Sequence, residues 1–484
     1  MATTNGTNGV NGVNGHANTP PHEQNVPATS LLAAFVANAT TDCLTPAMLE
    51  KLHELLIDYI GVVVGARDNA DSTEPIYAAI RALQGPQVTG PCTVLGMGAP
   101  HMLPQYAGLL NSAFGHSMDF DDTHVEGPLH PGVTAISAAM TQAELLGSSS
   151  SSLDFLLAMA IGYEITVRVG RELDYSTYDR GFHLTSIAGI YGAVASIAVL
   201  KHLDAKTVEM AWGLAGSKAA GSMQYLDNGS WNKRLHPGFA VHDAFMCVGL
   251  AEAGVIGATR IFEGKMGFLQ AYSPNPNQDM RRLTAGLGTE WLWPASSLKP
   301  YPACRMTHGF IELSGNMHTA AKGGVSAADV SAITLSMSPA CFKLIGDPSP
   351  NKKHPNNVID GQFSAYFQVA NALAYGSKTG LQAYSRLSDE KIHALCDKIT
   401  VKIVTSMKGF EARMDVQWAD GRTDQVEQLF PLGETQHPFT RDKVDEKFFS
   451  LAVPVYGEAK SRDIIKMVDS LEKHSVEQLL VLLR

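Results

Sequence analysis

The sequence predicts a mainly α-helical protein: a large all-helical domain built from both chain ends, with an inserted smaller α+β lid domain. Three patterns lead to this prediction. Apolar residues recur at helical spacing over residues 28–275, alternate with polar residues in short runs over residues 276–435, and return to helical spacing over residues 436–484. A chain of 484 residues is also too long for one ordinary core, which favours two units.

Residues 1–27 form a low-complexity segment rich in Asn and Gly. Such a composition cannot bury a core, so a disordered tail is expected. The segment lacks the basic start and apolar run of a secretory signal. It also lacks the arginines of a mitochondrial presequence, because the first Lys or Arg is Lys51. Its composition resembles the tails of fungal proteins, which would suit an enzyme of secondary metabolism.

The helical pattern begins clearly after Thr45-Pro46, an N-cap followed by proline at the first helical position. Apolar residues then recur every three or four positions up to Gly65, which is expected to end this helix. Four later segments are apolar on most faces, as helices in the middle of a large helical domain are. These segments are Pro131–Leu146, Leu153–Val169, Leu184–Leu200 and Ala205–Ala220.

The pattern changes to short strands in the region that follows. Ile333, Leu335 and Met337 alternate with polar residues, and a second alternating run covers residues 399–403. A third run leads into Asp420-Gly421, a strong hairpin signal, so a further strand is expected through Val426. Helical segments are expected between these strands and again at the end of the chain, over 364–375, 388–398 and 441–483.

The bulk composition excludes several classes of protein. Net charge is -10, which argues against nucleic acid as a partner because phosphate binding needs a basic surface. The longest uncharged apolar stretch, Leu184–Leu200, falls short of a membrane span, so no membrane partner is expected. The six cysteines form no C-x-x-C pair, which is typical of reduced thiols and a cytoplasmic location.

Histidines gather with other polar groups in four stretches that also contain Gly or Pro, as loops at a functional site often do. They are residues 116–132 (HSMDFDDTHVEGPLHPG), 179–186 (DRGFHLTS), 229–238 (GSWNKRLHPG) and 299–309 (KPYPACRMTHG).

These residue types suit proton transfer beside a carboxylate. Histidine is the usual general acid or base near neutral pH, and Lys or Arg can hold carboxylates and stabilise developing negative charge. Lys233, Arg234, Lys299 and Arg305 would suit a di- or tricarboxylate, and the carboxylates of residues 119, 121 and 122 would orient a histidine. Any one of these histidines taken alone is more often structural.

Other site classes lack their motifs. Neither H-E-x-x-H nor a calcium-loop spacing is present, so no metal is predicted. The patterns G-x-G-x-x-G, the P-loop and G-x-S-x-G are also missing, so neither a nucleotide cofactor nor a serine nucleophile is expected.

The same stretches resemble the MmgE/PrpD family, which includes 2-methylcitrate dehydratase, cis-aconitate decarboxylase and iminodisuccinate epimerase. The resemblance covers nearly all of the chain after the tail. The residues that carry it are TVLG at 93–96, DFDDTH at 119–124, KRLHPG at 233–238 and KPYPACRMTH at 299–308. HVEGPLH at 124–130 is similar to the fungal decarboxylase branch, whereas KPYPACR resembles the family at large.

The resemblance implies a homodimer, no organic cofactor, and a site between the helical domain and the lid. It also implies roles for individual residues. The candidate catalytic residues are His130, His183, Lys233, His308 and Asp119. The candidate substrate-binding residues are Asp122, His124, Arg234, Lys299, Tyr301 and Arg305.

The leading hypothesis is a cofactor-independent lyase that dehydrates citrate or an alkylcitrate. His130 or His183 would then be base and acid, while Lys233 and Arg305 hold carboxylates. Three alternatives stay open: decarboxylation of a cis-aconitate-like acid, epimerisation or isomerisation of a dicarboxylate, and a non-catalytic scaffold that only binds a carboxylate. Dehydration, decarboxylation and epimerisation all pass through a carbanion or aci-carboxylate, so a His/Lys/His set does not choose among these reactions.

Overall fold

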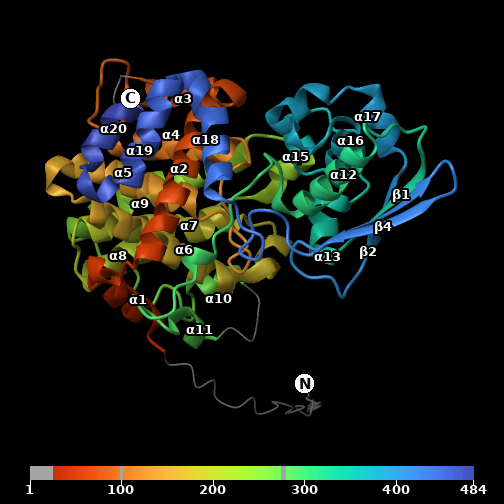
Figure 1. Cartoon of the computed structure of the whole chain (residues 1–484). Coiled ribbons are helices and arrows are strands. Elements are labelled where there is room, and N and C mark those ends of the chain that lie inside the picture. Colours follow the sequence, from red (N-terminus) through yellow and green to blue (C-terminus); the bar gives the residue numbers. More distant parts are fainter. Residues whose placement is uncertain (1–25, 99–101, 274–278) are drawn as a thin grey trace, which may run out of the picture.

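The computed structural model describes residues 26–98, 102–273 and 279–484, and helices dominate these ranges, as predicted. Figure 1 shows a large helical part and, beside it, a smaller part with a four-stranded sheet. The expected tail over residues 1–27 lies outside the described residues apart from its last two.

The helical part brings both ends of the chain together. α18 packs along α2, and α20 packs against α5. Its hydrophobic core collects side chains between Ala28 and Leu298 and again between Val444 and Leu483. The helices are α1 (Ala28–Ala37), α2 (Pro46–Asn69), α3 (Thr73–Gln84), α4 (Pro104–Ser117), α5 (Gly132–Leu146), α6 (Ser152–Asp179), α7 (Leu184–Leu200), α8 (Ala205–Ala215), α9 (Asn232–Glu252), α10 (Phe268–Tyr272), α11 (Met280–Thr284), α18 (Arg441–Tyr456), α19 (Glu458–Asp469) and α20 (Val476–Leu483).

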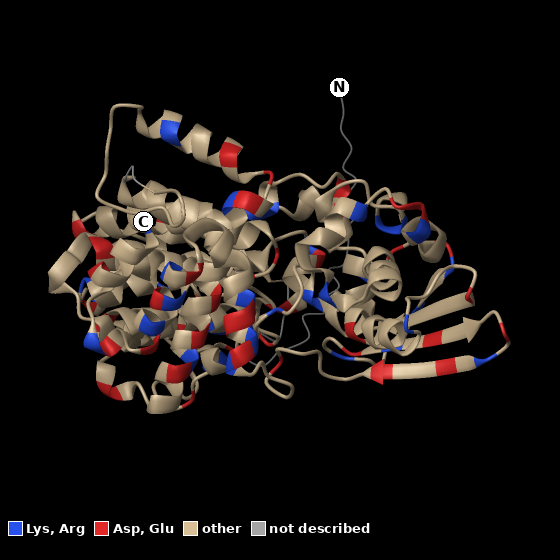
Figure 2. Cartoon of the chain, turned by 45° about the horizontal axis from the view of Figure 1, so that its top comes forward, with Lys and Arg blue, Asp and Glu red and all other residues tan. Residues whose placement is uncertain are grey.

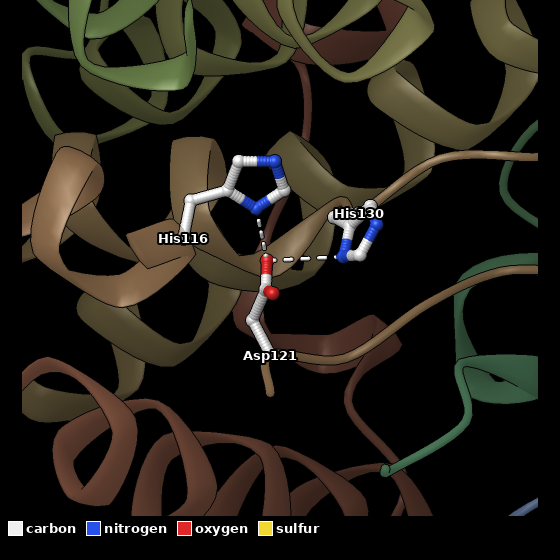
Figure 3. A group of neighbouring side chains, drawn as sticks. All are labelled: His116, Asp121 and His130. Atoms are coloured by element: carbon white, nitrogen blue, oxygen red, sulfur yellow. Dashed lines mark hydrogen bonds and ion pairs between the residues drawn. The ribbon is translucent and has the colours of Figure 1, made fainter. Parts of the chain in front are cut away.

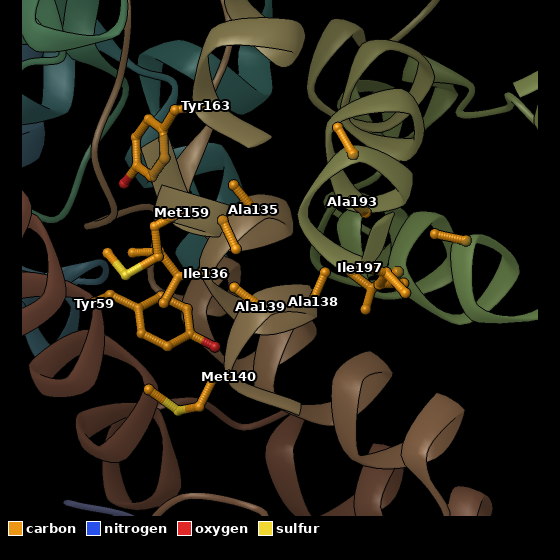
Figure 4. Close-up of a cluster of buried hydrophobic side chains, with 14 of the residues drawn as sticks. Tyr59, Ala135, Ile136, Ala138, Ala139, Met140, Met159, Tyr163, Ala193 and Ile197 are labelled. Atoms are coloured by element: carbon orange, nitrogen blue, oxygen red, sulfur yellow. The ribbon is translucent and has the colours of Figure 1, made fainter. Parts of the chain in front are cut away.

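α5 lies in the middle of this core. It contacts α2, α6 and α7, and Figure 4 shows its small side chains facing Tyr59 of α2, Met159 of α6 and Ile197 of α7. Because alanine and glycine let helix backbones approach closely, a helix without a polar face can be enclosed on most sides. Three of the four apolar segments are such central helices, α5, α6 and α7, whereas α8 buries only one face and is half-buried or exposed on the other.

The lid has a core of its own, which collects residues between Met223 and Val416. The sheet order is β2-β1-β3-β4; β1 runs parallel to β2 and antiparallel to β3. The hairpin at Asp420-Gly421 is confirmed, with Gly421 at φ 89° between β3 and β4. The elements are α12 (His308–Ala320), β1 (Val330–Met337), α13 (Pro339–Cys341), α14 (Pro350–Lys353), α15 (Val358–Gln362), α16 (Ala365–Tyr375), α17 (Glu390–Cys396), β2 (Ile399–Ile403), β3 (Ala412–Trp418) and β4 (Thr423–Gln428).

Three helix ends differ from expectation. Gly65 does not end its helix: α2 runs on to Asn69, and a Cβ at Gly65 would lie 2.8 Å from Leu451, so this glycine permits close contact with α18. α6 continues to Asp179 across a kink at Asp174. α8 stops at Ala215, so the chain is free to place the carbonyl of Gly221 2.9 Å from the backbone N–H of His183.

Close packing of α6 on α7 gives a stability prediction. A Cβ at Gly192 of α7 would lie 1.8 Å from Thr166 Oγ1 and 2.5 Å from the carbonyl oxygen of Gly162. We expect Gly192→Ala to lower the free energy of unfolding by about 1–3 kcal/mol, because the helices must move apart. Urea denaturation measures this change.

Gly249 is the matched control for that substitution. It is an exposed residue of α9, and a Cβ there would have no neighbour within 4 Å. Gly249→Ala is expected to raise the free energy of unfolding by about 0.5–1 kcal/mol, because alanine favours a helix interior. Equal effects of the two substitutions would contradict the packing argument.

Acidic and basic residues are both present in the helical part and in the lid, and neither sign is confined to one of them (Figure 2). Among the described helices, none is long and apolar enough to cross a bilayer.

Candidate active site

A cavity lies where the helical part meets the lid. It is lined by charged and imidazole side chains on one side and by aromatic and aliphatic side chains on the other, a mixture that is typical of small-molecule sites. Seven of the eleven residues predicted from the sequence line it: Asp119, His124, His130, His183, Lys233, Lys299 and Arg305.

Asp119 is the centre of the polar part of the cavity. Its Oδ1 accepts a hydrogen bond from Lys233 Nζ at 2.7 Å and lies 3.1 Å from Lys299 Nζ. Lys299 Nζ also donates to the Asp119 carbonyl oxygen at 2.9 Å. Burial alone would raise the pKa of Asp119, but the two lysines and His130 together lower it, so this residue is a carboxylate.

The backbone of Asp119 is strained. Its φ is 52°, in the left-handed region that a non-glycine residue rarely adopts. Such a conformation persists only where its surroundings enforce it, and strained residues concentrate at functional sites. Here Lys233, Lys299 and the end of α4 hold the turn in place.

Asp121 links two histidines (Figure 3). Its Oδ2 lies 2.7 Å from His116 Nδ1 and 3.1 Å from His130 Nδ1. A carboxylate in this position favours the tautomer with a proton on Nδ1, so Nε2 of each ring becomes the reactive nitrogen. Nε2 of His116 lies 3.0 Å from Lys233 Nζ, and Nε2 of His130 lies 3.9 Å from Asp119 Oδ1.

His183 is held by a second histidine. Its Nδ1 lies 3.1 Å from Nδ1 of His236, so one ring donates and the other accepts. Ser186 Oγ donates to the carbonyl oxygen of His236 at 3.0 Å, which fixes the backbone of this pair. His183 also stacks on His116, with ring centroids 5.5 Å apart, and so joins the Asp119–Asp121 cluster.

The N-termini of α5, α7 and α9 lie at the cluster. His130 precedes α5 by two residues, His183 is the N-cap of α7, and Lys233 lies in the first turn of α9. Neither α7 nor α9 has a side-chain cap, so the positive ends of both helix dipoles lie beside the cluster. The arrangement therefore provides positive potential beside groups that can transfer protons.

The histidines of the cluster are neutral at physiological pH. Burial, with Lys233 as a further cause, lowers the pKa of His116 to about 3 against the opposing effect of Asp121. Burial also lowers the pKa of His130 and that of His183, and it lowers the pKa of His236 to about 4. Neutral imidazoles can act as bases, and a bound polyanion would favour their protonation.

The lowered pKa of His236 gives a pH prediction. The unfolded chain protonates this histidine near pH 6.5, but the folded protein does so only near 4, so the unfolded state binds more protons between these values. Acid therefore removes stability through His236. The variant His236→Gln has no titrating group at this position. We therefore expect its free energy of unfolding, relative to that of the wild type, to rise by about 1.4 kcal/mol for each unit by which pH falls through this window.

Urea denaturation of both proteins at pH 6.5, 5.5 and 4.5 measures the difference in unfolding free energy. Because both proteins share every other titrating group, the difference reports on His236 together with its hydrogen-bond partner His183. A difference that does not vary with pH would contradict the buried neutral state of this ring.

Four predicted residues do not line the cavity. The guanidinium of Arg234 contacts Asp71 and Ser72 on another face of α9. Asp122 accepts from the backbone N–H of Gly132, and burial together with nearby carboxylates raises its pKa to about 8. His308 is buried against the Ala303 carbonyl oxygen and Arg305, and Tyr301 contacts its ring.

Sequence reasoning did not select several residues that the structure brings into or against the cavity. His116 stands in the 116–132 stretch and His236 stands in KRLHPG, so the signal was present, but their partners could not be read from spacing. Asp121 was expected to orient a histidine, but the sequence did not say which one. Glu434 lies far along the chain and pairs with Arg305, with Nη2 and Oε1 2.6 Å apart. Tyr175, Tyr178 and Tyr225 also line the cavity, with no motif to mark them.

His116, Asp121 and His130 also have the donor atoms of a metal site, all within 4.8 Å of one another. Two observations argue against a metal ion at this position. The Asp121 oxygen is already at hydrogen-bond distance from both rings, and the Lys233 ammonium lies 3.0 Å from His116, where it would repel a cation.

Comparisons with known proteins cover almost the whole described chain. The MmgE/PrpD N-terminal domain matches residues 30–281, and the MmgE/PrpD C-terminal domain matches residues 301–473. A cis-aconitate decarboxylase of Aspergillus terreus is 27% identical over 471 residues, covering 92% of this chain and 93% of the relative. A cis-aconitate decarboxylase-like protein of Aspergillus oryzae is 28% identical, covering 94% and 97%, and the human cis-aconitate decarboxylase is 23% identical, covering 92% of each.

Proposed function

The chain belongs to the MmgE/PrpD family, and we propose that it is a lyase of small polycarboxylic acids that decarboxylates a cis-aconitate-type substrate. One observation supports the proposal above the others: Lys233 and Lys299 meet at Asp119, beside His130 and His183 and at uncapped helix ends. Dehydration was the leading hypothesis from the sequence. The relatives are named as cis-aconitate decarboxylases or as a decarboxylase-like protein, and these names favour decarboxylation.

The chemistry of this step requires an electron sink and a proton donor. In an unsaturated tricarboxylate, the C–C bond to one carboxylate breaks and its electron pair forms a new double bond. The former double bond shifts its electrons toward the next carboxylate, giving an aci-carboxylate, and a proton then adds to the carbon beside it. Carbon dioxide and an itaconate-type dicarboxylate are the products.

The polar cluster can supply both requirements. An ammonium group near the developing aci-carboxylate stabilises negative charge in a site where water is scarce, and Lys233 and Lys299 are both buried. The proton would come from the Nε2 position of His130 or from His183, once the bound polyanion has raised the pKa of the imidazole. Arg305, paired with Glu434, would hold a further carboxylate.

Dehydration of a citrate is the second candidate. It is favoured by His130 and His183, which are neutral before substrate binds, because removal of a Cα proton needs a base. Proton NMR of the purified protein with citrate and with cis-aconitate, in separate samples without added cofactor, distinguishes the two reactions. An itaconate-type product from cis-aconitate supports the proposal. An alkene formed from citrate, with cis-aconitate unchanged as a substrate for decarboxylation, would replace it with the dehydratase.

The homodimer expected from the resemblance has a candidate surface. Phe239, Met246 and Leu250 are exposed on α9 and recur at spacings of seven and four, so they share one helix face. Val255 and Ile256 extend this apolar patch.

We expect Phe239→Arg to shift the protein from dimer to monomer in sedimentation analysis, while Leu83→Arg, at an exposed position of α3, leaves the dimer intact. A wild-type monomer would contradict this expectation.

A further inference from the structure

The turn that carries Asp119 is held at three consecutive backbone carbonyls. It follows the C-terminal end of α4, where carbonyl oxygens have no partner within the helix. Each carbonyl accepts a hydrogen bond from a buried side chain of another segment: Met118 from Gln362 Nε2 at 2.8 Å, Asp119 from Lys299 Nζ at 2.9 Å, and Phe120 from Lys447 Nζ at 2.7 Å. Lys299 lines the cavity, whereas Gln362 and Lys447 lie behind the turn and do not.

Lys447 reaches the turn from α18, in the C-terminal part of the chain. Its Nζ lies 2.6 Å from Asp58 Oδ1 of α2 and 4.0 Å from the centre of the Phe120 ring. The ammonium therefore contacts both the carbonyl and the ring of the residue between Asp119 and Asp121. The buried ion pair with Asp58 keeps the ammonium in this position.

Gln362 reaches the same turn from the lid. It is the last residue of α15, and its own carbonyl oxygen accepts from the backbone N–H of Cys304 at 3.0 Å. Its bond to the Met118 carbonyl crosses from the lid to the helical part. The turn therefore has its full set of partners only while the lid is seated on the helical part.

We infer that Gln362 and Lys447 are positioning residues, which fix the strained turn and so place the carboxylates of the site. Asp119 then meets the two lysines of the cavity, and Asp121 meets two histidines. A non-glycine residue at φ 52° keeps that conformation only while its surroundings enforce it, so release of a neighbouring carbonyl lets the turn relax. This inference rests on the proposed function and adds to it two residues that act through the turn.

Removal of either donor tests the inference. Gln362→Met keeps the length of the side chain but not its donor. Lys447→Met is combined with Asp58→Asn, so that no buried carboxylate is left without its partner. We expect each of these two variants to lower kcat by about 10–100-fold, because a shift of about 1 Å in the reacting groups is enough for such a loss.

Two further variants are matched controls. Asp58→Asn alone removes the ion pair but leaves Lys447 on the Phe120 carbonyl. Gln84→Met removes another buried glutamine, which donates to the Val88 carbonyl and does not line the cavity. Both controls should keep kcat within about threefold of the wild type. Losses as large as those of the test variants would overturn the inference, because buried polar groups would then support the fold alone.

The pH profile of kcat/KM separates misplacement of the turn from a loss of folded protein. Burial lowers the pKa of His116 and that of His130, and Asp121 opposes this effect. The other titrating and charged groups near these rings are Asp119, His183, Lys233 and Lys299. A displaced turn weakens the effect of Asp121, so the limb set by these imidazoles should move to lower pH in both test variants. An unchanged profile would overturn the inference.

Hydrogen exchange distinguishes failure of the inference from failure of the proposed function, because it needs no turnover. Mass spectrometry of a peptide that spans residues 117–123 reports how readily the turn opens. We expect this peptide to exchange about tenfold faster in the two test variants than in the wild type and the two controls. If it does so while the wild type turns over no acid, the positioning role stands and only the proposed reaction fails. Equal exchange in all of these proteins overturns the inference, whatever the reaction.

Discussion

Lys233→Met is expected to lower kcat by about 10²–10³-fold, because it removes a preorganised cation from the place where charge develops. Lys233 Nζ contacts both Asp119 Oδ1 and His116 Nε2, at 2.7 and 3.0 Å, and it lines the cavity. Methionine keeps most of the apolar stem, so the loss concerns the ammonium. Steady-state kinetics on the best acid, together with circular dichroism to check the fold, measures the effect.

Arg234 is the matched control for Lys233. The two residues are neighbours in KRLHPG, but the guanidinium of Arg234 contacts Asp71 and Ser72, outside the cavity. We expect Arg234→Met to keep kcat within about threefold of the wild type, since it removes no donor from the site of charge development. A comparable loss in both variants would mean that the motif supports the fold and not the chemistry.

Asp121→Asn is expected to lower kcat by about 10²–10⁴-fold, the range found for removing general acid–base function. The amide has one acceptor in place of a carboxylate that faces two imidazoles. It therefore no longer holds Nδ1 of His116 and Nδ1 of His130 in their protonated form, and the reactive Nε2 is lost from one ring or both. The pH profile of kcat/KM should also change shape, which a loss of stability alone would not produce.

Asp122 provides the control in the adjacent position. Burial first, then the charges of Asp121 and Asp58, raises the pKa of Asp122 to about 8, so this side chain is a neutral acid at pH 7. Asparagine resembles a neutral carboxyl in size and charge, and its oxygen can still accept from the Gly132 N–H. Asp122→Asn should therefore retain most activity; a loss as large as that of Asp121→Asn would contradict the assignment of charge to Asp121.

The helical fold was predictable because burial leaves a periodic pattern in the sequence. Central helices such as α5 and α7 have no polar face, and the alternation in β1 and β3 marks one buried side of a sheet. Helix ends were less predictable because they depend on distant contacts. Gly65 carries the signal of a helix end, yet its role is to admit Leu451 from a segment almost four hundred residues later.

The candidate site was predictable as a set of loops but not as a set of contacts. Neighbouring residues on a helix point about 100° apart, so Lys233 faces the cavity while Arg234 does not. The role of Asp121 depends on how the chain returns from α4 to bring His130 beside His116, and the apolar side of the cavity depends on packing within the lid. Neither has a sequence motif, because both arise from tertiary structure.

The most direct test of the proposed site is a carbon-13 NMR time course with cis-aconitate labelled at every carboxyl group, using purified wild-type protein and Lys233→Met without added cofactor. The proposed site predicts one equivalent of labelled carbon dioxide or bicarbonate for each acid consumed by the wild type, and almost none from the variant. Labelled acid that persists with the wild type, or carbon dioxide released equally by both proteins, would contradict it.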